Sequence, residues 1–96
     1  MFTKSISLFA GSLLAMGLFA GAALADGDVK CTDAPPASWK HTKEEAEKAV
    51  TDAGYELRKT LITEGGCFEV YGVKDGQLFE LFYNPVNMKL VATIKK

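Results

Sequence analysis

The residues best suited to chemistry are the two cysteines, Cys31 and Cys67, and the single histidine, His41. Both cysteines follow a predicted signal peptide, and an even number of cysteines in an oxidising compartment is typical of a disulfide. A metal site made of these three side chains is the alternative, but it lacks a closely spaced pair of ligands. We therefore predict a Cys31–Cys67 disulfide, with no metal and no cofactor.

Two further groups contain residue types that are used in catalysis. Asp33, Ser38 and His41 are close in sequence, but a nucleophile, its base and an orienting acid need a rigid scaffold and a pocket, and this segment predicts neither. Glu69 and Glu80 form a carboxylate pair on one face of a predicted hairpin, where the expected role is to keep that face soluble and to limit edge pairing. We expect no catalytic residue and a protein that is not an enzyme.

The first 25 residues have the parts of a secretory signal peptide. Lys4 precedes the uncharged apolar stretch 6–24, and Ala23-Leu24-Ala25 is a small-residue cleavage site. An uncleaved membrane anchor is the alternative, because the apolar stretch is long enough to span a bilayer. We expect cleavage after Ala25, a periplasmic location and no stable membrane insertion afterwards. The formal charge of −1, with interspersed signs, gives no indication of nucleic-acid binding.

The mature chain predicts an arm, a helix and a sheet. Residues 26–40 contain Pro35-Pro36 and many small polar residues, which favours an extended arm held by Cys31. Thr42 and Glu45 fit a capping box, and Gly54 is placed to end the helix. The four expected strands are 55–63, 67–74, 77–83 and a short one at 88–94. The fold class is α+β, with one N-terminal helix packed on a four-stranded antiparallel sheet, and its domain spans residues 41–96.

The Asp75-Gly76 turn predicts the register of the central hairpin, with Lys74 opposite Gln77. Alternation then separates two faces. One carries no charge and should lie under the helix around Val50, with Trp39 packed at its end and with space above Gly72 for the helix or for Trp39. Its residues are Phe68, Val70, Phe79, Leu81 and Tyr83.

The opposite face of the hairpin is only half polar, and a single helix leaves it without a cover from within the chain. We take it as a candidate surface for binding a partner, and expect Phe82→Glu to abolish binding without unfolding the domain. The candidate binding residues are Glu69, Tyr71, Leu78, Glu80 and Phe82.

The order of the motifs resembles the PepSY domain, in particular its small secreted single-domain members. The strand 67–71, the Asp75-Gly76 turn and the closing Tyr83-Asn84-Pro85 are similar to the hairpin of that family. The resemblance covers residues 31–94, with one departure, Asn87-Met88 in place of a glycine after the final turn. The positions that match the small secreted members are Cys31, Pro35, Trp39, Gly54, Tyr55 and Cys67.

The resemblance implies a module that restrains a peptidase, and it transfers no catalytic residue. The partner expected on this basis is a secreted or periplasmic peptidase or another envelope protein, and a homodimer stays open. The alternative is a small-ligand-binding or structural envelope protein without a peptidase partner, which predicts a ligand pocket near Trp39 and Gly72.

Overall fold

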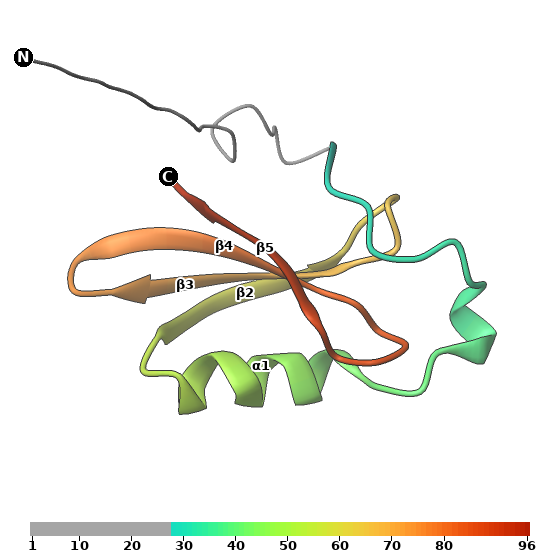
Figure 1. Cartoon of the computed structure of the whole chain (residues 1–96). Coiled ribbons are helices and arrows are strands. Elements are labelled where there is room, and N and C mark those ends of the chain that lie inside the picture. Colours follow the sequence, from blue (N-terminus) through green and yellow to red (C-terminus); the bar gives the residue numbers. More distant parts are fainter. Residues whose placement is uncertain (1–27) are drawn as a thin grey trace, which may run out of the picture.

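One helix, α1 (Lys43–Asp52), lies against a four-stranded antiparallel sheet in the computed structural model, which describes residues 28–96 (Figure 1). Within this range the helix precedes the strands, and the fold is α+β. The predicted signal peptide and its cleavage site lie outside the described residues. In residues 28–96 no helix is long and apolar enough to cross a membrane.

The start of α1 follows from its capping residues. The Thr42 hydroxyl accepts a hydrogen bond from the backbone N–H of Glu45 at 3.2 Å, as expected for an N-cap. The Glu45 carboxylate does not return to the Thr42 backbone but contacts Nδ1 of His41 at 2.6 Å. Only one half of the predicted capping box is therefore formed. The chain leaves the helix at Gly54, whose φ of 96° favours glycine.

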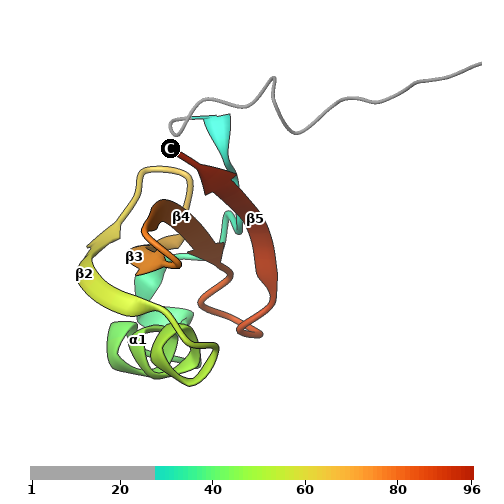
Figure 2. The ribbon, with the colours of Figure 1, turned by 90° about the vertical axis from the view of Figure 1, so that its left-hand side faces the viewer.

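The sheet is a meander in which the strands follow one another in space as in sequence (Figure 2). The central hairpin has the predicted register, from Lys74 opposite Gln77 to Phe68 opposite Tyr83. Its turn residues Asp75 and Gly76 have φ values of 53° and 77°, which suits a two-residue turn between twisted strands. The strands are β2 (Glu56–Ile62), β3 (Phe68–Lys74), β4 (Gln77–Tyr83) and β5 (Leu90–Lys95).

The last strand begins later than predicted and is nearly as long as the others. The turn after β4 extends to Lys89, because the Asn84 carbonyl accepts the N–H of Met88 at 2.7 Å and Asn84 N–H donates to the Lys89 carbonyl. Met88 has a φ of 60°, in the left-handed region where glycine is favoured. Met88 therefore has a backbone conformation that favours glycine, and β5 starts only at Leu90.

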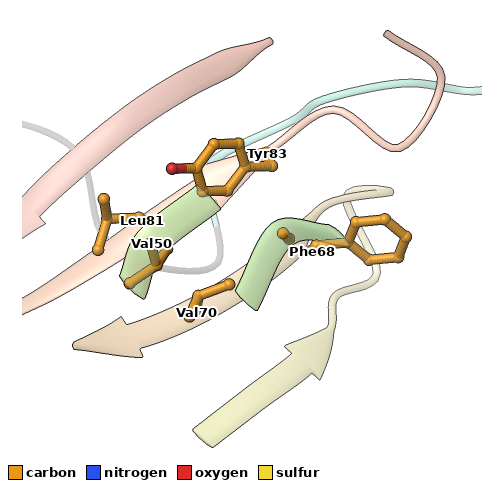
Figure 3. Packing of buried hydrophobic residues seen from close by; sticks show 6 residues of the cluster. Val50, Phe68, Val70, Leu81 and Tyr83 are labelled. Carbon is orange, nitrogen blue, oxygen red and sulfur yellow. The ribbon is translucent and has the colours of Figure 1, made fainter. Parts of the chain in front are cut away.

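The main core lies between α1 and the sheet, as Figure 3 shows for residues of α1, β3 and β4. Ala46 and Val50 of α1 are fully buried. A Cβ on Gly72 would lie 2.9 Å from Cβ of Tyr55 and 3.2 Å from Cγ1 of Val50, so this position requires glycine and lets the helix approach the sheet. The buried sheet residues of this core are Phe68, Val70, Leu81 and Tyr83, and Trp39, Tyr55 and Phe79 pack around them.

The buried Tyr83 side chain makes the stability of the core depend on pH in the alkaline range. Burial raises the pKa of its hydroxyl above the ordinary value of 10.0, and a negative charge on Tyr55 would raise it further. Because the pKa of Tyr83 is higher in the folded than in the unfolded protein, the hydroxyl loses its proton more easily after unfolding. Its contribution to the unfolding free energy is therefore fully present below pH 10 and is lost as the pH rises through the folded pKa. We expect urea unfolding to show a shallower alkaline fall in stability for Tyr83→Phe than for wild type. Equal pH dependence of the two proteins would contradict this assignment.

Candidate functional site

The face of the hairpin opposite α1, here called the second face, was expected to be open. It comprises the predicted binding residues together with Val73. Phe82 is 0% exposed, Glu80 1% and Glu69 5%. The expectation that the chain leaves this face uncovered is therefore wrong at these positions, and Phe82 belongs to a second core rather than to a surface.

The cover of the second face comes from the arm and from β5. Val29 is 4% exposed and packs with Cys67 and Phe82, and the partly buried side chains of Ala92 and Ile94 in β5 pack against the same cluster. The predicted Cys31–Cys67 disulfide is confirmed, with a Cα–Cα distance of 5.1 Å. The bond holds the arm, which carries Val29, against the sheet, so a segment without a regular hydrophobic pattern supplies the missing layer.

Close backbone contacts fix the position of the arm beside the β2–β3 turn (Figure 1). The N–H of Cys31 donates to the Gly65 carbonyl at 2.9 Å, and the Asn84 side-chain amide donates to the Cys31 carbonyl at 3.0 Å. A Cβ on Gly65 would lie 2.3 Å from the Val29 carbonyl oxygen. The glycine pair that indicates the turn in the sequence therefore also leaves the space in which the backbone of the arm packs. Within the arm, Pro36–Ser38 form a short 3-10 turn instead of the expected extended chain.

Glu69 and Glu80 are buried on the second face, where charged side chains are rarely found. They lie on neighbouring strands, since Glu69 is opposite Phe82 and Glu80 is opposite Tyr71. The ammonium group of Lys96 lies 3.1 Å from Oε2 of Glu80. Oε2 of Glu69 has no hydrogen-bond partner among the described residues. Neither carboxylate has the simple solvated role that the sequence predicts.

Tyr71 and Leu78 are the predicted binding residues that stay partly exposed. The ammonium group of Lys59, in edge strand β2, lies 4.9 Å from the centre of the Tyr71 ring, in the range of a cation–π contact. Their role in binding a partner stays a prediction.

The other chemistry-bearing residues are engaged locally. The Ser38 hydroxyl donates to the Pro35 carbonyl at 2.7 Å, and the Trp39 indole N–H donates to the Ala34 carbonyl at 3.0 Å. The Trp39 ring packs edge-on against Phe68, with ring centres 5.5 Å apart. Among residues 28–96 no group of three or more His, Cys, Asp or Glu side chains could hold a metal ion.

A hollow of about 330 Å³ lies between the arm and the β2–β3 turn. Its lining carries both signs of charge, from Asp28, Lys30 and Glu64, and a backbone segment at Gly65. Among residues 28–96, no aromatic or aliphatic residue lines the hollow, whereas small-molecule sites are mostly apolar with a few placed polar groups. This hollow does not have the character of a ligand site.

Large exposed apolar side chains occur instead along the two edges of the sheet. Leu61 and Ile62 end edge strand β2 and are 41% and 55% exposed, and Leu90 and Val91 begin edge strand β5 and are 46% and 42% exposed. These four positions were not predicted from the sequence. The uncharged stretch 90–94 between Lys89 and Lys95 is the signal that could have found the second pair.

Comparison with known proteins gives one match, to a family model. Residues 9–94 match the family model PepSY_2, described as "Peptidase propeptide and YPEB domain". No curated protein and no solved structure matches the chain significantly. Since the family match covers nearly the whole chain, including the helix and all strand residues except Lys95, the protein belongs to the PepSY family of peptidase propeptide and YPEB domains.

Proposed function

We propose that this protein is a non-enzymatic module that is exported to the periplasm, where it binds a peptidase and restrains its activity. The observation that carries the proposal is the match of residues 9–94 to a domain whose description names peptidase propeptides. The disulfide-held arm adds support, because a protein that binds a peptidase must offer few loose segments for cleavage.

The alternative function is a small-ligand-binding or structural envelope protein, and the described residues do not form the pocket on which it depends. It predicts a pocket near Trp39 and Gly72. The space above Gly72 is filled by Tyr55 and Val50, and the Trp39 ring packs against Phe68. No observation in the described part of the chain therefore favours a small ligand over a protein partner.

The test is an inhibition experiment with the oxidised, exported protein. We expect casein hydrolysis by the envelope extract of the producing organism to fall in a saturable manner as the protein is added. Intact-mass measurement of the added protein should show that it survives, because an inhibitor binds without being consumed. The matched control is the same protein after reduction and alkylation. If the oxidised and the alkylated protein slowed casein hydrolysis equally, or if the oxidised protein were degraded, the protein would be acting as a substrate that competes with casein. Either result would contradict the proposal.

A further inference from the structure

Strand β5 (Leu90–Lys95) is an outermost strand of the sheet, and nothing in the described part of the chain pairs with its outer edge (Figure 2). The run Leu90–Ile94 has no charge and no proline. An edge strand of this kind is a template for pairing with another strand, unless bulges, charges or prolines protect it.

The hydrogen-bond pattern shows which backbone groups face outward. The N–H of Lys96 donates to the Leu78 carbonyl at 2.9 Å, and the same register pairs Ile94 with Glu80 and Ala92 with Phe82. In an antiparallel pair, every second residue directs its N–H and C=O groups to the neighbouring strand. The residues between them, Thr93 and Lys95, therefore direct these groups away from β4.

The other edge strand, β2, is better protected. Its regular pairing is interrupted between Leu57 and Lys59, and such irregularities hinder edge pairing. Glu56 and Arg58 carry charges there and form an ion pair at 3.1 Å. Strand β5 has its own irregularity at Val91, near its start, which leaves 92–95 in regular register. The edge of β5 is thus the more open of the two.

Charge selects the kind of strand that fits this edge. The uncharged run is bounded by Lys89 and Lys95, both exposed. An added strand with acidic residues at both ends would place carboxylates beside these cations, and oppositely charged pairs across strands stabilise a sheet. A second copy of β5 would bring the same cations to the seam, which opposes self-pairing.

We propose that the outer edge of β5 binds an extended peptide segment by strand addition, and that the segment is acidic at both ends of a short apolar stretch. The proposal rests on the proposed function, in which this segment belongs to the partner peptidase. Backbone hydrogen bonds to Thr93 and Lys95 supply affinity, and the flanking lysines supply selectivity. Leu90 and Val91 provide apolar contact at one end of the edge.

The probe is a short amidated peptide, EVTVTVE, with KVTVTVK as its matched control. We expect the acidic peptide to bind the oxidised protein at least about tenfold more tightly than the basic one, and the difference to shrink as salt screens the charges. Amide hydrogen exchange should slow at Thr93 and Lys95 when the acidic peptide is bound. Equal binding of the two peptides, or protection at β2 instead, would overturn the proposal.

Thr93→Pro tests the edge directly, because it removes an N–H that points away from β4 and leaves the β4–β5 ladder intact. We expect it to weaken binding of the acidic peptide about tenfold or more, while Thr93→Ala, which keeps the N–H, retains binding. If Thr93→Pro fails to fold, the double variant Lys89→Glu/Lys95→Glu should reverse the preference toward the basic peptide. Unchanged preference in that variant, or dimerisation through β5 in sedimentation experiments, would contradict an acidic strand as occupant.

The two proposals fail in distinguishable ways. Peptide binding at β5 without inhibition of envelope proteolysis would refute the peptidase function and leave the edge site standing. Inhibition by Thr93→Pro as strong as that by wild type would refute the edge site and leave the function standing.

Discussion

Replacing Phe82 by glutamate is expected to unfold the domain. The ring is 0% exposed and lies between Val29, Cys67 and the side chains of β5. Removing such a ring costs about 3–5 kcal/mol, and burying a carboxylate adds to this cost. Since a small domain has a total stability of only about 5–15 kcal/mol, little native protein should remain. Circular dichroism and urea unfolding of the oxidised protein measure this loss.

The matched control for Phe82→Glu is Leu90→Glu, the same change at an apolar residue that is 46% exposed. It should alter the unfolding free energy by about 0.5 kcal/mol or less, as exposed substitutions usually do. A stable, cooperatively folded Phe82→Glu protein would show that the second core contributes little. The sequence-based expectation for Phe82→Glu, loss of binding in a folded domain, is thereby replaced by loss of the fold.

The parts of the structure that sequence reasoning predicted are those with local signals. The Asp75-Gly76 turn determines the hairpin register, because both residues accept positive φ and the strands have a period of two. The start of α1 follows from Thr42 in the same way. The late start of β5 escaped prediction because Met88 has a left-handed φ that its residue type does not favour.

The candidate site was harder to predict because its cover is made by contacts distant in sequence. Nothing in the pattern around Val29 indicates that this residue packs on Phe82, and the cysteines show only that the arm is attached. For Glu69 and Glu80 the sequence predicts a role in keeping the face soluble, because it shows no acid/base partner or pocket for them. The contact of Lys96 with Glu80 follows from the β4–β5 register, in which Ile94 lies opposite Glu80 and Lys96 opposite Leu78, and the sequence did not define that register because the turn before β5 is irregular.

Removal of the disulfide is expected to have the second large effect. Cys31 and Cys67 are 36 residues apart in sequence, and the chain-entropy model assigns about 3–4 kcal/mol to closing a loop of this size. We expect the double variant Cys31→Ala/Cys67→Ala to lose about this much unfolding free energy. Alanine is chosen because serine would bury a hydroxyl at the fully buried position 67. Urea unfolding of both proteins without reductant gives the difference.

A further substitution separates the entropic effect of the bond from its role in holding the arm. Val29→Ala should cost about 2 kcal/mol in the oxidised protein, where the side chain is buried against Phe82. In the double alanine variant the same change should cost almost nothing if the arm leaves the sheet when the bond is absent. An equal cost in both backgrounds would mean that the hydrogen bonds of Cys31 to Gly65 and Asn84 hold the arm by themselves. The bond would then act on the unfolded chain alone, and the cover of the second face would not depend on the redox state.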